Sequence, residues 1–179
     1  MAMHASSADS RRIEIRQARP GDAADIKAVL DQARQAQRDN GFVQWADGYP
    51  SIDIVNADIR SGLAFRLCAG GRTAGYAVLV VGDDGYSDVE ACFGIAGSFA
   101  VVHRLAIADG FRGHGLAAEF MLLLEAEAAS MGIAAMRVDT GEANTCMLRL
   151  MHRLGYIPRG LVAFRWGPRM AFEKALRKL

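Results

Sequence analysis

The chain has 179 residues, of which 51% are hydrophobic and 23% are charged, and its formal net charge is +1. This length predicts one domain with a substantial core, and the hydrophobic fraction excludes a largely disordered chain. Because the net charge is close to zero, no field draws the protein onto nucleic acid or a membrane, and neither is expected as a partner.

The ends and the cysteines predict where the protein works. Residues 1–10 are small and polar and are expected to form a flexible tail, which leaves 11–179 as a single domain. There is no apolar signal core and no run of membrane-spanning length, so a cytoplasmic location is expected. Cys68, Cys92 and Cys146 have apolar neighbours and no metal-ligand spacing. They are predicted to be buried free thiols in a reducing compartment, with no metal site.

The first half of the chain predicts a strand, two helices and a strand hairpin. Residues 13–18 alternate between apolar and polar, as a half-buried strand does. Asp22 is predicted to cap a first helix that ends near residues 40–41, and Ser51 a second helix that ends near Arg60. Strands at 63–69 and 73–81 are predicted to be joined by two glycines.

Residues 99–117 combine a strand, a glycine-rich turn and the start of a helix. Apolar and β-branched residues run to 108, Asp109 and Gly110 end the strand, and a helix is predicted from about 113 to 131. Such a turn exposes backbone N–H groups at the positive end of a helix dipole, which suits an anion such as pyrophosphate. Arg112 and His114 oppose the dipole unless an anion occupies the turn.

The remaining segments complete the pattern. Residues 86–98 predict an irregular excursion near a site. A strand at 134–140 and a helix at 144–154 follow, and 161–166 and 170–174 predict two closing strands. The order β-α-α-β-β-β-α-β-α-β-β predicts an α/β fold with a mixed sheet and helices on both faces.

Two motifs resemble those of one enzyme family. Arg112-Gly-His-Gly115-Leu-Ala117 fits Arg/Gln-x-x-Gly-x-Gly/Ala, which resembles the acyl-CoA-binding signature of the GCN5-related N-acetyltransferase (GNAT) superfamily. The strand end Arg137–Thr140, then Asn144, then Leu150–Tyr156 resemble the family's strand, asparagine and helix that ends in Leu-Gly-Phe/Tyr. The predicted element order is also that of the family, so the resemblance covers nearly the whole chain and implies the GNAT fold.

The resemblance implies an activity and its partners. A GNAT enzyme binds acetyl-CoA between its fourth and fifth strands and transfers the acetyl group to a primary amine by direct attack in a ternary complex. Residues 44–50 and 102–107 resemble a bacterial subgroup whose acceptors are mostly unassigned, so the acceptor is left as a small molecule or a peptide. The closing strands often support dimers in the family, which makes a homodimer a candidate assembly.

The cofactor site implied by the resemblance draws on the fourth strand, the turn and the helix after the asparagine. Backbone groups of residues 105–107 would pair with the pantetheine arm, and the Leu105 N–H would polarise the thioester oxygen. Asn144 would bond the arm or cap its own helix. The implied cofactor-binding residues are Leu105, Ala106, Ile107, Arg112, Gly113, His114, Gly115, Leu116, Ala117, Asn144, Met147 and Met151.

The general acid of the family is missing at its usual position. Many members place a Tyr seven residues after the asparagine, where this chain has Met151. The acid would then be His152, another group, water, or nothing, because a thiolate leaves without much help. This departure motivates a second hypothesis, a catalytically weak acyl-CoA-binding module. A dinucleotide binder is a third and weaker one, because Gly-x-Gly-x-x-Gly is absent.

His103 is the candidate general base, as an imidazole close in the chain to Leu105. On a regularly alternating strand His103 and Leu105 share one face and Arg104 takes the other. The competing interpretation is a buried, hydrogen-bonded histidine with a structural role. Leu105, His103 and Glu90 are the predicted catalytic residues, with Asp139 and His152 as further candidate bases.

The acceptor side is predicted from the aromatic loop at residues 44–50. Trp45, Asp47 and Tyr49 together could hold the apolar body and the cationic amine of a small substrate. The competing interpretation is that Trp45 and Tyr49 only cover the first helix.

Overall fold

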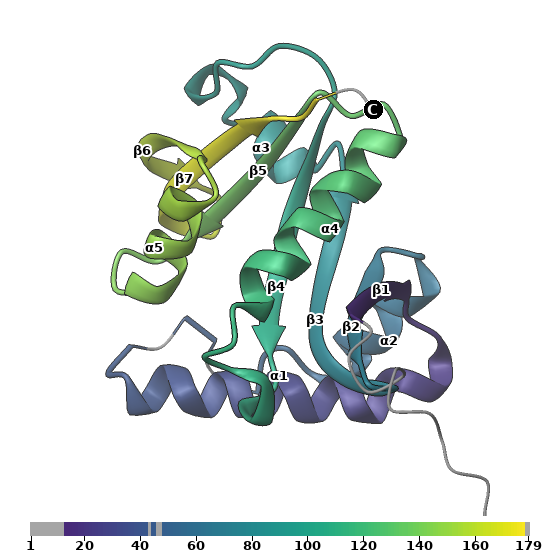
Figure 1. The fold of residues 1–179 in the computed structure, drawn as a ribbon. Coiled ribbons are helices and arrows are strands. Elements are labelled where there is room, and N and C mark those ends of the chain that lie inside the picture. Colours follow the sequence, from purple (N-terminus) through teal and green to yellow (C-terminus); the bar gives the residue numbers. More distant parts are fainter. Residues whose placement is uncertain (1–12, 43, 46–47, 178–179) are drawn as a thin grey trace, which may run out of the picture.

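One mixed sheet of seven strands runs through the described part of the chain (Figure 1). The computed structural model describes residues 13–42, 44–45 and 48–177, so the predicted tail and Asp47 lie outside the described residues. The strands are β1 (Ile13–Gln17), β2 (Ala64–Ala69), β3 (Arg72–Val81), β4 (Phe99–Ile107), β5 (Ala135–Thr140), β6 (Ile157–Phe164) and β7 (Gly167–Ala175), in the sheet order β1-β2-β3-β4-β5-β7-β6. The α-helices are α1 (Ala23–Asp39), α2 (Ile52–Arg60), α3 (Asp84–Ser87), α4 (Leu116–Ser130) and α5 (Thr145–Arg153), and the 3-10 turns are η2 (Pro20–Asp22), η3 (Glu90–Cys92) and η4 (Asp109–Phe111). The predicted fold class is confirmed, and the predicted element order differs from the structure only in lacking the short helix α3.

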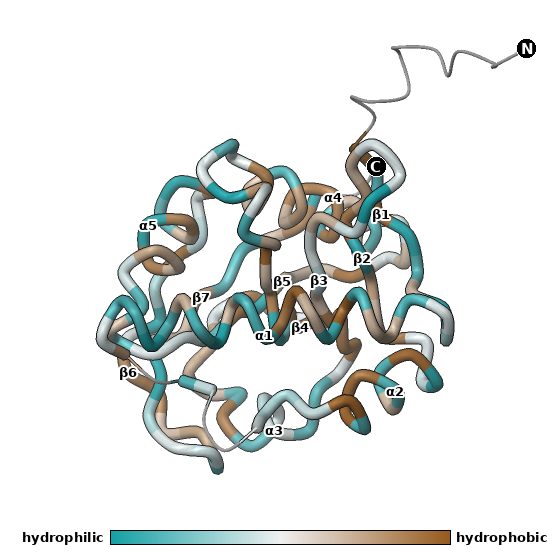
Figure 2. Tube along the Cα trace, turned by 90° about the horizontal axis from the view of Figure 1, so that it is seen from below, coloured by the Kyte–Doolittle hydropathy of each residue, from teal (hydrophilic) through white to brown (hydrophobic). Residues whose placement is uncertain are grey.

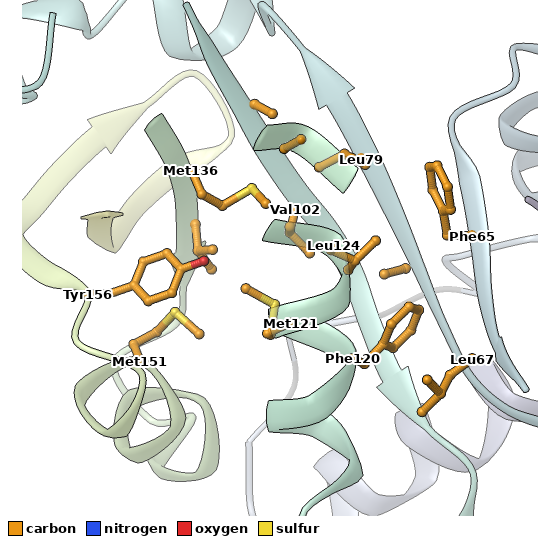
Figure 3. Packing of buried hydrophobic residues seen from close by; sticks show 14 of the residues in the cluster. Phe65, Leu67, Leu79, Val102, Phe120, Met121, Leu124, Met136, Met151 and Tyr156 are labelled. Atoms are coloured by element: carbon orange, nitrogen blue, oxygen red, sulfur yellow. The ribbon is translucent and has the colours of Figure 1, made fainter. Parts of the chain in front are cut away.

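Each face of the sheet carries its own hydrophobic core. The core on the α4 face includes Leu67, Leu79, Val102, Phe120, Met121 and Leu124, and Figure 3 shows these side chains packed between helix and sheet. The core on the α1 face includes Ile26, Leu30, Val55, Tyr76, Val78 and Ala106. Hydrophobic and hydrophilic residues alternate along α1 in Figure 2, as expected for a helix with one buried side. Within the described ranges, no helix has the length and apolar character needed to cross a membrane.

Local signals in the sequence are confirmed in part. The Ser51 hydroxyl accepts a hydrogen bond from the Ile54 N–H at 3.3 Å and caps α2 as predicted. Asp22 precedes α1, but its carboxylate accepts from the Arg19 N–H at 2.8 Å and does not cap the helix. The prediction of three buried thiols was wrong for Cys92 and Cys146, which are exposed. Ala91 beside Cys92 is exposed as well, so apolar neighbours in sequence did not predict burial.

Helix α4 begins three residues later than predicted. Gly113 and Gly115 adopt left-handed backbone conformations, with φ of 81° and 79°, which no continuous right-handed helix accommodates. The turn at residues 112–115 is therefore an open loop before the helix rather than its first turn.

Candidate active site

The sheet opens between β4 and β5. These two strands pair in parallel only from Phe99↔Ala135 to Val101↔Arg137. Beyond these pairs the strands separate, as Figure 1 shows in the lower half of the sheet. Backbone groups of β4 from Val102 onward therefore face a gap instead of a neighbouring strand.

A β-bulge lies where β4 enters the gap. Tyr76 pairs with Ala106 and Val78 pairs with His103. Between these two pairs β4 therefore contains one residue more than β3. The extra residue is accommodated at Arg104, which has a φ of +55°, a strained conformation for any residue other than glycine. Such strain often accompanies function, because surrounding contacts must maintain it.

The bulge overturns the prediction that His103 and Leu105 share a face of the sheet. Leu105 packs against the core on the α4 face. His103 pairs with Val78, whose side chain belongs to the core on the α1 face, so the imidazole lies on that side. Arg104 also points to the α1 face, where its guanidinium contacts Asp58. Strict alternation fails because the bulge shifts the pattern by one residue.

The backbone amides of Leu105 and Ile107 point into the gap. The Ala108 N–H donates to the Ala74 carbonyl at 2.9 Å, which fixes the phase of the antiparallel ladder with β3. Successive residues of a strand direct their amides to opposite sides, so Ala106 faces β3 and Leu105 and Ile107 face away from it. The Ile107 carbonyl, which points the same way as its amide, accepts from Arg112 Nε at 3.0 Å.

A cavity of about 550 Å³ lies on the α4 side of the gap and is named the β4–α4 cavity here. Strand β4 contributes residues 105–107, and the following loop contributes Arg112, Gly113 and Gly115. In the part of the chain that the structure describes, the N–H groups of residues 113–117 donate to no protein acceptor, and residues 113–115 are exposed. Five free amides at a helix N-terminus form an anion site that fits a pyrophosphate.

A second cavity, of about 500 Å³, lies where the gap meets the loops of the α1 face, and is named the loop cavity. Its lining comes from α1, the 44–49 loop, β3–β5, α5 and the turn between β6 and β7. The lining residues are Gln37, Gln44, Trp45, Tyr49, Val80, Asp83, Val102, His103, Arg104, Leu105, Val138, Asp139, Thr140, Asn144, Met147, Arg165, Trp166 and Arg169.

The two cavities meet at four shared residues, Gln37, Leu105, Asn144 and Met147. The Asn144 side chain accepts from the Met147 N–H at 3.2 Å, so it caps α5 while lining both cavities. Gln37 holds the aromatic loop, because its side-chain oxygen accepts from the N–H groups of Gln44 and Trp45 at 3.1 Å each.

His103 is held by a carboxylate within the loop cavity. Its Nε2 lies 2.8 Å from Asp83 Oδ2. That hydrogen bond lowers the pKa of Asp83 below its ordinary value and keeps the carboxylate charged. A charged partner at Nε2 retains the proton there and leaves Nδ1 as the acceptor, since Nδ1 has no partner among the described residues.

Asp139 is also engaged. Its Oδ1 accepts from the Tyr86 hydroxyl at 2.5 Å, and its Oδ2 lies 3.9 Å from Arg169 Nε. Tyr86 is fully buried, and burial together with the Asp139 charge raises its pKa well above the ordinary value.

The predicted acceptor residues lie in the loop cavity where the structure describes them. Trp45 is buried in the core on the α1 face and also lines the cavity, and its role toward an acceptor stays a prediction. Tyr49 is 36% exposed, and its hydroxyl accepts from Arg104 at 2.9 Å.

Several predicted site residues lie elsewhere. Glu90 lines neither cavity. Its carboxylate accepts hydrogen bonds from the two terminal nitrogens of Arg137, at 2.5 and 2.8 Å. This contact lowers the pKa of Glu90, which makes it a poor base. Met151 is fully buried beside Tyr156 in the α4-face core (Figure 3), and His114 and His152 are exposed outside both cavities.

The sequence did not point to several lining residues. No role is predicted for Asp83, although an acid just after the end of a strand is a candidate partner for a nearby histidine. Arg165 and Trp166 form the β6–β7 turn and Arg169 lies on β7, and the contact of these segments with β4 and β5 depends on the strand order.

The comparisons with known proteins agree with this architecture. The family model described as "Acetyltransferase (GNAT) family" matches residues 29–156. A GNAT acetyltransferase from Streptococcus agalactiae is 30% identical, with a TM-score of 0.81 over 93% of this chain and 96% of its own. A polyamine N-acetyltransferase from Drosophila melanogaster shares the fold at 16% identity, with a TM-score of 0.68 over 92% and 100%. The PaiA N-acetyltransferase from Thermoplasma acidophilum, solved with coenzyme A, has the same identity and TM-score over 92% and 99%. A comparison with curated proteins gave no match.

The chain therefore belongs to the acetyltransferase (GNAT) family. Membership makes it an acyl-CoA N-acyltransferase, and acetyl-CoA is the cofactor of the family.

Proposed function

We propose that this protein transfers the acetyl group of acetyl-CoA to a primary amine of a small molecule or peptide, by direct attack while both are bound. The meeting of the two cavities at Leu105 carries this proposal. One cavity offers free backbone amides, and the other offers titratable and aromatic side chains. A donor in the first and an acceptor in the second would meet at the opening between β4 and β5.

The β4–α4 cavity has the donor set that acetyl-CoA requires. The N–H groups of residues 113–117 would hold the pyrophosphate, and the gap-facing amides of Leu105 and Ile107 would pair with the extended arm. Leu105 N–H is the donor available to the acyl oxygen. Acetyl-CoA would supply the acyl carbon as a thioester. Attack by a neutral amine forms the C–N bond and breaks the C–S bond, and the proton lost from nitrogen balances the thiolate that leaves.

In this proposal His103 takes the proton of the amine. Asp83 fixes the imidazole by its bond to Nε2, and Nδ1 is the atom that would receive the proton. Asp83 then stabilises the imidazolium, as a charged partner that is already in place. Position 151 supplies no hydroxyl, because it is a methionine, and its side chain is fully buried in the core. The thiolate would then leave without a side-chain acid from that position.

Release of thiol tests this function. Wild-type protein mixed with acetyl-CoA should release free CoA only when a primary amine is added, and mass spectrometry should find that amine heavier by one acetyl group. A tertiary amine of similar charge serves as the control and should give no release. Binding of acetyl-CoA without amine-dependent release would contradict the proposal and favour the acyl-CoA-binding module. The cytoplasmic location and the homodimer stay predictions of the sequence.

A further inference from the structure

The charged side chains of the loop cavity include an acidic group beside β4 and a basic group near the β6–β7 turn. The acidic group is Asp83, bound to His103. The basic group is Arg165 in the turn and Arg169 on β7, and the Asp139 carboxylate lies 3.9 Å from Arg169 Nε. The Trp166 ring lies near both groups. Its centroid is 6.4 Å from that of His103 and 5.7 Å from the Arg165 guanidinium carbon.

The third arginine of the cavity is not available to a ligand. Arg104 donates to Asp58 at 2.7 Å and to the Tyr49 hydroxyl at 2.9 Å, and its side chain is only 17% exposed. Asp58 in turn accepts from the buried Tyr76 hydroxyl at 2.7 Å. This closed network neutralises Arg104 within the protein.

Arg165 and Arg169 keep binding capacity. Over the described residues, Arg165 has no carboxylate partner and only the face of Trp166 beside it. Arg169 approaches Asp139 at 3.9 Å through Nε, beyond hydrogen-bond distance, and donates through one terminal nitrogen to the Pro168 carbonyl. A guanidinium presents a planar fork that matches a carboxylate in two parallel hydrogen bonds.

We infer that the acceptor is a small zwitterion, a molecule with a primary amine and a carboxylate. This inference rests on the proposed acetyl transfer and specifies its acceptor. The amine lies toward His103 and Leu105, and the carboxylate lies against Arg165 and Arg169. The cavity volume of about 500 Å³ accommodates an amino acid or a short peptide.

A polyamine fits this distribution poorly. Its second ammonium would lie against two arginines, and both acids that line the described part of the cavity are already engaged, Asp83 by His103 and Asp139 by the Tyr86 hydroxyl. A like charge placed there opposes binding, whereas a carboxylate is attracted.

The test compares matched acceptors in the thiol-release assay. The probes are amino acids and short peptides, the same compounds with the carboxylate replaced by an amide, and the diamines putrescine and cadaverine. For the amino acid or peptide that reacts best, kcat/KM should exceed that of its amide by about tenfold or more. The two diamines should have the lowest kcat/KM of all the probes. Equal rates for acid and amide, or a preference for diamines, would overturn the inference while leaving acetyl transfer intact. Turnover of none of the three groups would instead count against the proposed function itself.

Variants locate the carboxylate. Arg165→Gln and Arg169→Gln should each raise KM for the acid by about tenfold and leave the kcat/KM of its amide within about twofold. Arg38→Gln removes the same charge from an exposed position of α1 outside both cavities and should change neither. An equal loss of kcat/KM for the acid and for its amide would show that the arginines only maintain the turn, and would overturn the assignment.

Discussion

The two cavities differ in how they are built. The β4–α4 cavity takes its most distinctive groups, the backbone amides, from one continuous stretch, residues 105–117, and α1 and α5 complete its walls with side chains. The loop cavity gathers single side chains from segments as distant in sequence as Gln37 and Arg169. A site made of backbone needs only the correct local conformation. A site made of distant side chains needs the whole sheet order, which makes the loop cavity the more variable part of such a scaffold.

Gly115→Glu should give the largest effect, because it alters the backbone cavity directly. The glycine has a φ of +79°, and the new carboxylate would compete with an anion for the same amides. Acetyl-CoA should raise the melting temperature of the wild type and leave that of the variant unchanged. Gly132→Glu is the matched control, since Gly132 has a φ of +76°, open space around it and a place at the far end of α4. A normal shift in folded Gly115→Glu protein would refute the assignment of the cavity.

Glu173→Ala should be the most destabilising of these changes. Glu173 is fully buried and accepts from Gly94 N, Ile95 N, Arg159 and Arg137, so it ties the 88–98 loop to β7. Its removal leaves Arg137 buried without this partner, which typically costs about 3–5 kcal/mol. Denaturant titration measures the free energy of unfolding, with exposed Glu119→Ala as the control. A loss below about 1 kcal/mol would mean that this network contributes little.

His103→Gln should lower kcat about a hundredfold if the imidazole takes the proton of the amine. Acetyl-CoA binding should stay within about twofold, because His103 does not line the β4–α4 cavity. Equal rates in the two folded proteins would instead leave His103 with a structural role.

Asp83→Asn should lower the free energy of unfolding by the smallest amount, and only at pH values where the carboxylate is charged. The wild-type pKa of Asp83 is lowered by His103, so its contribution is complete above the unfolded-state pKa of about 3.9. The contribution disappears as the pH falls through the lower pKa of the folded protein. The free energy of unfolding of the wild type should therefore exceed that of the variant by about 1–2 kcal/mol at pH 7, and this difference should disappear in strong acid, below the ordinary pKa of an aspartate. A difference that is independent of pH would contradict this account of the pair.

The fold and the cofactor side could be predicted because their signals are local. Periodicity and the two glycines before α4 are features of neighbouring residues. The face of His103 could not be predicted, because a single inserted residue at Arg104 reverses the alternation and is recognised only from the pairing with β3. Glu90 failed as a candidate base for a similar reason. Its partner Arg137 is 47 residues away, and nothing in the sequence shows that the pair forms.

Initial rates measured while acetyl-CoA and a good acceptor are varied together test the central claim most directly. In the proposed mechanism both molecules occupy adjoining cavities before the acetyl group moves, so double-reciprocal plots of CoA release should give lines that intersect. Parallel lines would indicate that the acetyl group passes first to the protein. That result would contradict direct transfer at the junction beside Leu105.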